Sequence, residues 1–491
     1  MDILNNVQSI QYFIPELILV VFAAGVIIYD LISRQEGGRR AAHLSLAGLA
    51  AALIAVLLVG AADRSLFLGM VQLDSFAVFF KVIILITTAV TILFSMGSEE
   101  LDPRTKGEYY ALLLAVTLGM FLMASSTHLL MIYLSIETVS LASYILAGFL
   151  THSPRSSEAA FKYIIYGAVA SGTMLFGISL IFGLTGTGDV VQVSNVLAEL
   201  FSSGGGDYQL AVLVSIIFVL AGVGYKIASV PFHMWSPDVY EGAPIPITAF
   251  LSVASKSAGF ALFIRLFYSG FGSANVIESV DWSLLLAVVA ALTMTVGNLA
   301  ALPQQNVKRL LAYSSIAHGG YVLMGGVLLT AEGVHAILFY LIIYLFMNLG
   351  AFFVVILIAE RIGSETIDGY RGLVTRAPLV AISMGIFLFS LTGIPPLSGF
   401  IGKWLLFKAV LTEEFYWLAI VGLLNSVVSL YYYVRIVKAM FLDSSDEPNP
   451  VSFSIGSRAL LVVFVVPTII LGLYWTPVYQ LSKASLGKIL G

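Results

Sequence analysis

The feature of this sequence that most restricts its fold is a succession of long apolar segments separated by short polar ones. A helix needs about 20 mostly apolar residues to cross the hydrocarbon core of a bilayer. Fourteen segments are long enough, at approximately 13–32, 42–62, 74–97, 109–125, 128–150, 160–183, 209–231, 245–270, 282–301, 310–330, 334–360, 378–411, 415–441 and 457–480. Because lipid offers no partners to an open backbone, such segments must be helical. We predict an all-α integral membrane protein with about fourteen transmembrane helices.

Composition supports this class and excludes others. Of the 491 residues, 59% are hydrophobic and only 11% are charged, whereas a soluble domain is about a quarter charged. The net charge of −4 gives no reason to expect nucleic-acid binding. Without cysteine, the chain cannot supply disulfides, thiolate ligands to iron–sulfur clusters or c-type haem attachments, and its six histidines lack metal-site spacing. Redox chemistry within the chain is not expected.

The distribution of basic residues predicts the orientation, because cytoplasmic connections are enriched in Lys and Arg. Connections on the other side of the membrane, and the chain ends, carry Arg64, Lys408, Lys483 and Lys488. Connections after odd-numbered segments carry Arg34, Arg39, Arg40, Arg104, Lys106, Arg155, Lys162, Lys308, Arg309, Arg361, Arg371, Arg376, Lys438 and Arg458. Both termini should therefore face away from the cytoplasm. The N-terminal segment has no basic leader or small-residue cleavage site, so we interpret it as a retained first span.

Two segments share an unusual combination of features. GVGYKIASVPFHMW (222–235) and TGIPPLSGFIGKW (392–404) each contain a Gly/Pro interruption, one lysine and a nearby tryptophan. Interrupted helices at matching places in two halves of a chain are typical of transporter sites. These are the seventh and twelfth segments, so the repeat unit is five helices, and an odd number requires successive units to be inverted. The longest polar connection, roughly 184–208, is rich in Gly and Ser and is expected to be a flexible outer loop.

Four isolated charges within apolar segments are the candidate functional residues: Glu137, Lys226, Lys256 and Lys403. A charge at this depth costs about 2.5–3.5 kcal/mol even on the lenient insertion scale, so each needs a reason to be there. A pathway for protons is the default reason, and structural ion pairing is the alternative. Glu137 is the natural partner of Lys226, and a pair that opens and closes would switch whether the lysine holds its proton.

The other titratable residues in apolar segments support weaker hypotheses. His233 and His318 have the right chemistry to carry protons between lysines, although a lone buried histidine is more often only hydrogen-bonded. Ser252, Ser255 and Ser257 surround Lys256 and can hold water beside it. Four further charges lie close to segment ends, and their side chains are expected to reach the interface: Glu16, Lys81, Arg265 and Arg435.

Three stretches resemble the antiporter-like membrane subunits of respiratory complex I, the proton-translocating NADH:quinone oxidoreductase. They are PFHMWSPDVYEGAPIPITAFLSVASK (231–256), QQNVKRLLAYSSIAHGGY (304–321) and LTGIPPLSGFIGKW (391–404). The form PDVYEGAP is similar to subunit N, also called subunit 2, whereas the M and L subunits and Mrp-type antiporters differ there. The chain ends soon after the last apolar segment, which argues against the L subunit with its long lateral helix.

The resemblance implies fourteen core helices, with the fourth to eighth and the ninth to thirteenth forming two inverted units. It implies a three-helix segment at 1–108, a first repeat at 109–270, a second at 271–441 and a C-terminal helix at 442–491. By motif, Glu137 corresponds to the family's fifth-helix glutamate and Lys226 to its seventh-helix lysine. Lys256 and Lys403 correspond to the charged residues of the eighth and twelfth helices. The resemblance thus implies a Glu/Lys proton relay.

The implied function is proton translocation in a bacterial inner membrane, driven by quinone reduction elsewhere in a larger complex. FMN, iron–sulfur clusters and quinone would belong to partner subunits, and this chain would hold no cofactor. The implied neighbours are an antiporter-like M subunit and small K- and J-type subunits. An Mrp-type cation/proton antiporter subunit is the main alternative, and a scaffold whose charges only pair with one another is a second. A solute transporter is disfavoured because no segment offers a clustered polar site.

Overall fold

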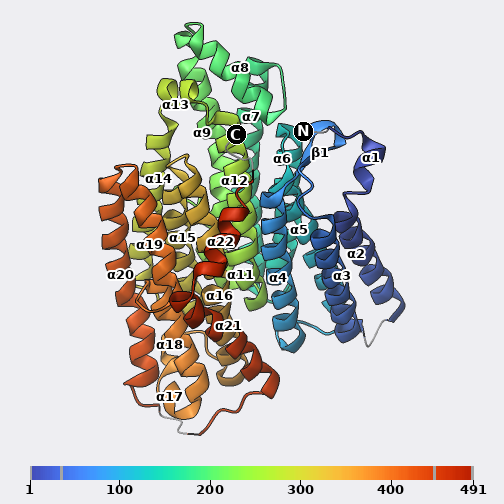
Figure 1. The fold of residues 1–491 in the computed structure, drawn as a ribbon. Coiled ribbons are helices and arrows are strands. Elements are labelled where there is room, and N and C mark those ends of the chain that lie inside the picture. Colours follow the sequence, from blue (N-terminus) through green and yellow to red (C-terminus); the bar gives the residue numbers. More distant parts are fainter. Residues whose placement is uncertain (1–2, 34–36, 446–448, 488–491) are drawn as a thin grey trace.

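The chain forms a bundle of helices that stand side by side (Figure 1). This computed structural model describes residues 3–33, 37–445 and 449–487. The first and the last described residues lie toward the same end of the bundle, and α17 (Leu373–Arg376) lies at the opposite end (Figure 1). An even number of membrane crossings returns the chain to the side on which it began.

Fourteen helical segments follow the order of the predicted spans. The first three are α2 (Ile14–Ser33), α3 (Gly37–Val59) and α4 (Ser75–Gly97). The next five are α5 (Lys106–Ser125), α6 (Leu129–Ala147), α7 (Pro154–Thr185), α9 (Gln209–Ile227) with α10 (Trp235–Gly242), and α11 (Ile245–Phe250), which continues through a π-helical turn (Leu251–Ser255) into α12 (Lys256–Phe271). The last six are α14 (Trp282–Ala301), α15 (Val307–Gly326), α16 (Ala331–Ile362), α18 (Pro378–Thr392) with α19 (Ser398–Thr412), α20 (Tyr416–Phe441) and α21 (Ile455–Leu473).

Shorter elements connect or flank these segments. They are α1 (Asn6–Ile10), α8 (Val190–Ser202), α13 (Ala274–Val280), α17 and α22 (Thr476–Ala484), with 3₁₀ turns at Phe67–Gly69, Gly206–Tyr208 and Ile367–Tyr370. Strands β1 (Arg64–Leu66) and β2 (Val71–Leu73) form an antiparallel hairpin with Arg64 opposite Leu73. This hairpin was not predicted, because its strands are only three residues long.

Within the described residues, twelve helices are long and apolar enough to cross a membrane by themselves. The two remaining predicted spans are α15 and the pair α18 and α19. α15 carries Lys308, Arg309 and several hydroxyl side chains, and it is almost entirely buried among other helices. α18 and α19 are each too short alone because the helix is interrupted. Every predicted span therefore coincides with a helix or an interrupted helix, which confirms the predicted fold class.

The two five-helix units match in their details. The sixth span, α7, and the eleventh, α16, each have 32 residues, and each ends at a left-handed glycine, Gly186 (φ 68°) and Gly363 (φ 71°). Glycine adopts this conformation without a steric penalty. The seventh and twelfth spans are both interrupted, as predicted. These correspondences confirm two repeats of five helices.

At each interruption, other helices satisfy the backbone groups that the broken helix releases. α9 is followed directly by Ala228, a left-handed residue with φ 58°, and α18 by Gly393 with φ 89°. The amide of Val230 donates to Thr293 Oγ1 at 3.0 Å. The carbonyl of Thr392 accepts from Lys403 Nζ at 2.9 Å. Irregular backbone is tolerated at membrane depth only with such partners.

Two predictions about connections were wrong. Most of the predicted loop 184–208 is helix α8, where Asp189 caps the first turn by accepting from the amide of Gln192 at 2.8 Å. Its buried positions, Val190, Val193 and Leu197, form one apolar stripe that total composition does not reveal. The fourteenth span ends at Leu473 and does not continue to residue 480, since α22 is a separate helix.

Close contact between α14 and α15 depends on glycine. A methyl group on Gly320 would lie 2.6 Å from the amide nitrogen of Met294, and one on Gly297 would lie 2.6 Å from that of Ala317. Small residues let helix backbones approach in this way in membrane proteins. The position of α15 in the bundle is therefore set by backbone contact.

Gly320→Ala is expected to destabilise the protein, because the added methyl group must push α15 away from α14. Overpacking of this kind costs about 1–3 kcal/mol. The control is Gly25→Ala on α2, where the methyl group would meet no atom within 4 Å. The melting temperature of the purified protein in detergent should fall for Gly320→Ala and stay constant for Gly25→Ala. Equal melting temperatures would contradict the packing argument.

Candidate functional site

The three lysines predicted as functional residues are deeply buried in the folded chain. Lys226, Lys256 and Lys403 are 1%, 4% and 4% exposed. They come from α9, α12 and α19, three helices from the two repeats. None of the three has reached an interface, so each charged group requires partners inside the bundle.

Lys226 lies two residues before the interruption of the seventh span. Its Nζ has no hydrogen-bond partner among the described residues. Its aliphatic stem packs against α12, where a methyl group on Gly259 would lie 3.4 Å from Lys226 Cγ. Because Gly259 is one helical turn from Lys256, the two lysines come from helices in direct contact.

Glu137 lies on α6 at the edge of the bundle. It is partly exposed and lines a groove of about 400 Å³ together with Tyr133, Tyr144, Ile164 and Ser171, among others. Its Oε1 atom is buried and has no hydrogen-bond partner among the described residues. Glu137 and Lys226 therefore do not form the predicted contact in this conformation, and the pair is open.

Lys256 begins α12 directly after the π-helical turn, a local irregularity that often marks functional sites. Its Nζ donates to the carbonyl oxygen of Ser315 at 2.6 Å. The hydroxyl of Ser315 in turn accepts from the hydroxyl of Tyr344 at 3.0 Å. The hydroxyl groups of Ser255 and Ser257 are buried without partners among the described residues. Lys256 thus lies among neutral polar groups.

Lys403 bridges the two parts of the interrupted twelfth span. Its Nζ donates to the Thr392 carbonyl at 2.9 Å and to Ser426 Oγ at 3.1 Å. It also lies 4.4 Å from the centre of the Tyr321 ring. Lys403 lines an apolar cavity of about 470 Å³ between α19 and α20. It is therefore held from several directions, again by neutral groups and a ring.

His318 occupies the interval between Lys256 and Lys403. Its Nδ1 lies 2.5 Å from the Tyr340 hydroxyl and its Nε2 lies 3.3 Å from that of Tyr433. Ser315 and Tyr321 are three residues before and after it, on the same face of α15. Ser315 binds Lys256, and Tyr321 shares Ser426 with Lys403, since its hydroxyl lies 3.0 Å from Ser426 Oγ.

One face of α15 thus lies between the two lysines, with His318 bound to Tyr340 and Tyr433 and to neither Ser315 nor Tyr321 among the described residues. We call the set Lys256, Ser315, His318, Tyr321, Ser426 and Lys403 the polar row. The sequence predicted its lysines and its histidine but missed its hydroxyl groups. The regular three-residue spacing of polar residues on α15 was the available signal.

His233 lies in the interruption between α9 and α10. It is 8% exposed, and its Nδ1 is buried without a hydrogen-bond partner among the described residues. It lies outside the polar row.

Three of the four charges predicted to reach an interface instead form buried ion pairs. Lys81 and Glu16 pair at 2.6 Å and are 4% and 1% exposed. Arg265 pairs with Asp74 at 2.6 Å. Arg435 is partly exposed and donates to the carbonyl of Leu302 at the end of α14, so its prediction stays open. The prediction for Glu16, Lys81 and Arg265 was wrong, because partners on neighbouring helices cannot be recognised from distance to a segment end.

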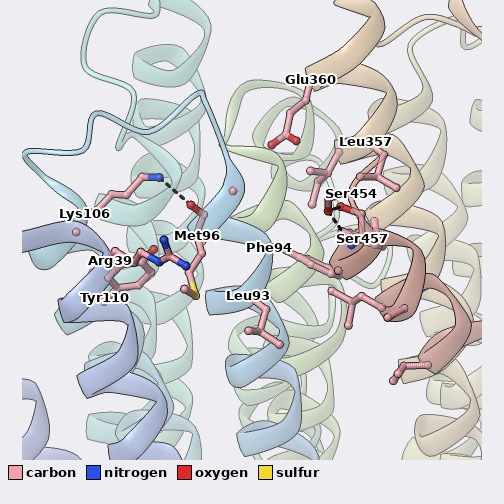
Figure 2. Close-up of a pocket in the computed structure, with 18 of the residues that line it drawn as sticks. Arg39, Leu93, Phe94, Met96, Lys106, Tyr110, Leu357, Glu360, Ser454 and Ser457 are labelled. Carbon is pink, nitrogen blue, oxygen red and sulfur yellow. Dashed lines mark hydrogen bonds between the residues drawn. The ribbon is translucent and has the colours of Figure 1, made fainter. Parts of the chain in front are cut away.

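A cavity of about 930 Å³ lies between the N-terminal helices and the pair α16 and α21. Figure 2 shows Arg39, Lys106 and Tyr110 on one wall and Leu357 and Ser454 on the other. It contains none of the polar row. Among the described residues, no three His, Asp or Glu side chains gather as a metal site would require.

Comparison with known proteins now identifies the family. The family model described as "NADH:quinone oxidoreductase/Mrp antiporter, TM" matches residues 126–429. NADH-quinone oxidoreductase subunit N from Anaeromyxobacter sp. is 45% identical over 511 aligned residues, covering 99% of this chain and 98% of the relative. The chain belongs to the NADH-quinone oxidoreductase subunit N family.

Solved structures agree with this membership and with the fold. A chain of respiratory complex I from Thermus thermophilus, solved with bound aureothin, is 30% identical with a TM-score of 0.79, covering 95% of this chain and 98% of that one. A chain of the Mrp complex from Dietzia sp. has a TM-score of 0.81 at 22% identity, covering 97% of each chain. The Mrp likeness shows a shared fold only. The resemblance of this family member to subunit N, inferred from its motifs, is confirmed.

In this member of the subunit N family, Lys81→Met is expected to destabilise the N-terminal helices strongly. Removing one partner of a buried ion pair typically costs about 3–5 kcal/mol, because the other charge is left unpaired. The double variant Lys81→Met with Glu16→Gln removes both charges and should recover most of the loss. The melting temperature of the purified protein measures both effects. A single variant as stable as the unsubstituted chain would contradict a structural role for this pair.

Proposed function

We propose that this chain translocates protons as a membrane subunit of an NADH-type quinone oxidoreductase in a bacterial inner membrane. Quinone reduction in other subunits would drive the transfer, so the chain would be a non-redox part of a translocase. FMN, iron–sulfur clusters and quinone would be bound by those other subunits. The name of the relatives and the arrangement of the buried lysines both support this proposal.

The observation that carries the proposal is the polar row. Lys256 and Lys403 are separated by hydroxyl groups and one imidazole that succeed one another along a single face of α15. Groups of this kind both accept and donate protons, so a proton can pass between the lysines without leaving the bundle. A purely apolar interior between the lysines would forbid that transfer.

We assign the roles as follows. A charge change in a neighbouring subunit alters the distance between Glu137 and Lys226. Lys226 then exchanges a proton with Lys256, for which His233 is a second carrier. Lys256 passes the proton through His318 to Lys403, the exit-side group. Closing a carboxylate onto a lysine favours its charged form and opening releases it, which gives the pair its control over transfer.

The proposed neighbours fit the positions of the two ends. Glu137 lines one groove at the edge of the bundle, and Lys403 lines a cavity between α19 and α20. We propose that K- and J-type subunits lie on the Glu137 side and that an M subunit covers the Lys403 side. We further propose that both termini face away from the cytoplasm, and that the chain divides at 1–108, 109–270, 271–441 and 442–491.

Lys256→Met and Lys403→Met should each abolish most proton pumping while the complex still assembles. The reason is that methionine fills the same space without a proton to transfer. Lys408→Met, on the same helix as Lys403 but exposed, is the control and should pump normally. Proton uptake by inside-out vesicles during NADH oxidation measures pumping, and NADH–ferricyanide activity measures assembly. Unchanged pumping in both buried variants would refute the relay.

The assignment to an oxidoreductase predicts the partners that purify with the chain. A tagged chain isolated in mild detergent should bring FMN and iron–sulfur clusters with it, detectable by flavin fluorescence and by electron paramagnetic resonance after reduction. Purification without either, together with rescue of a salt-sensitive host by the chain's own operon, would favour the antiporter instead.

A further inference from the structure

The cavity of about 930 Å³ between the N-terminal helices and the pair α16 and α21 has its polar groups at one end (Figure 2). Arg39 and Lys106 lie at the starts of α3 and α5, and Glu360 lies in the last turn of α16. Ser454 and Ser457 lie at the start of α21. All of these positions are at the end of the bundle that carries most of the basic connections.

Further into the bundle the lining of this cavity is apolar. Leu357 and Phe353 lie one and two turns inward from the charged end of α16. The two walls meet where Phe94 of α4 stacks on Phe353, with the ring centres 4.7 Å apart. Leu93 and Val463, one on each wall, are 43% and 55% exposed, so the apolar part opens at the outer face of the bundle. A cavity that is polar at one end and apolar below it matches an amphiphilic ligand.

Tyr110 lies between the polar and the apolar parts of the cavity. It is one helical turn inward from Lys106 on α5, and its side chain is fully buried. Its hydroxyl group has no hydrogen-bond partner among the described residues, which is unfavourable for a buried polar group. A ligand with an acceptor oxygen at this depth would provide the missing partner. The ester carbonyl groups of a phospholipid lie at this depth, directly below the headgroup.

The charges at the polar end are divided between the two walls. On one wall, Lys106 Nζ donates to the carbonyls of Ser95 and Ser98 at 3.2 and 3.1 Å, so the end of α4 holds it in place. Arg39 on the same wall is exposed, and Glu360 on the other wall is partly exposed. Among the described residues, neither Arg39 nor Glu360 forms an ion pair. A matching ligand therefore carries a negative group for the first wall and a positive group for Glu360.

We propose that this cavity binds a phospholipid whose headgroup carries a primary ammonium group, namely phosphatidylethanolamine. The phosphate lies between Arg39 and the first turn of α21, since a helix start favours an anion. The ammonium group donates to Glu360 in the last turn of α16, where a helix end favours a cation. An ester carbonyl accepts from Tyr110, and the acyl chains pack along the apolar walls. The lipid joins the N-terminal helices to α16 and α21, a role independent of the proton relay.

The lipid selectivity of the unsubstituted chain tests this assignment. The full chain in mild detergent is incubated with phosphatidylethanolamine, phosphatidylcholine or phosphatidylglycerol, each with two oleoyl chains, and native mass spectrometry measures the fraction with one lipid bound. Phosphatidylethanolamine should bind about tenfold more tightly than either other lipid, because a hydrogen bond to a charged group contributes about tenfold in affinity. The quaternary ammonium of phosphatidylcholine has no N–H to donate, and phosphatidylglycerol has no positive charge. Any other order of affinity would overturn the assignment.

Glu360→Gln tests the source of the selectivity. The change keeps the size of the side chain and removes its charge. The affinity for phosphatidylethanolamine should fall about tenfold, to that for phosphatidylcholine, while the affinity for phosphatidylcholine stays constant. Glu108→Gln is the matched control, since Glu108 is exposed at the same end of the bundle and does not line this cavity. Undiminished selectivity in Glu360→Gln would contradict the assignment.

Arg39→Gln and Tyr110→Phe should each weaken the binding of all three lipids, because the phosphate and the ester carbonyls are common to them. Arg361→Gln is the matched control for Arg39→Gln: Arg361 is exposed at the same end of the bundle and outside the cavity, so its replacement should leave binding unchanged. Binding of all three lipids as tight in Arg39→Gln as in Arg361→Gln would argue against a phosphate at this position.

Photochemical labelling locates the lipid without any substitution. A phosphatidylethanolamine with a diazirine in one acyl chain should label α4, α16 and α21 around Leu93, Phe353 and Val463, as read from the digested protein by mass spectrometry. Excess unlabelled phosphatidylethanolamine should suppress this labelling, and phosphatidylcholine should not. Labelling confined to helices outside the cavity, such as α7 and α20, would overturn the proposal. If a variant fails to fold, this experiment and the selectivity of the unsubstituted chain still decide.

Discussion

The hydrogen bond from Lys256 to the carbonyl of Ser315 is the interaction on which the arrangement of the site depends. It joins α12 of the first repeat to α15 of the second, at a depth where neither group can reach water at the surface. A buried ammonium group is costly unless it is paired or hydrogen-bonded, so this contact also fixes how the two repeats sit against each other. The same contact that stabilises the lysine places it at the start of the polar row.

The least apolar of the fourteen spans, α15, is central because it is enclosed. Its serines, histidine and tyrosines face other helices, and its backbone lies against α14 through Gly297 and Gly320. A helix of this polarity exposed to lipid would be unstable, whereas inside the bundle its side chains satisfy one another. The fold thus encloses a polar helix within apolar helices. Proton transfer across the protein requires this arrangement, because the polar groups must be kept away from lipid.

The sequence was sufficient for the larger features and insufficient for the contacts. Segment length predicted the spans, and Gly/Pro interruptions beside lysines predicted the broken helices, because both follow from the chain's local chemistry. Helix α8 was missed because its amphipathic stripe is short and lies beside a Gly/Ser-rich stretch. The position of Ser315 between Lys256 and Tyr344 could not be predicted because hydroxyl residues are common in helices, and only the packing of α12, α15 and α16 brings these three residues together. The buried pair of Lys81 and Glu16 joins residues 65 positions apart, which no local pattern reports.

The partners of the buried cations distinguish two kinds of charge in this bundle. Lys81 and Arg265 each contact a carboxylate at 2.6 Å. Neutralising either cation would leave a buried carboxylate without its partner. Lys256 and Lys403 instead bind carbonyl and hydroxyl groups, and among the described residues neither forms an ion pair with a carboxylate. Such a lysine can give up its proton and leave behind only neutral groups. In the proposed relay, reversible proton transfer would fall to the cations without counter-ions, while those with counter-ions hold the helices together.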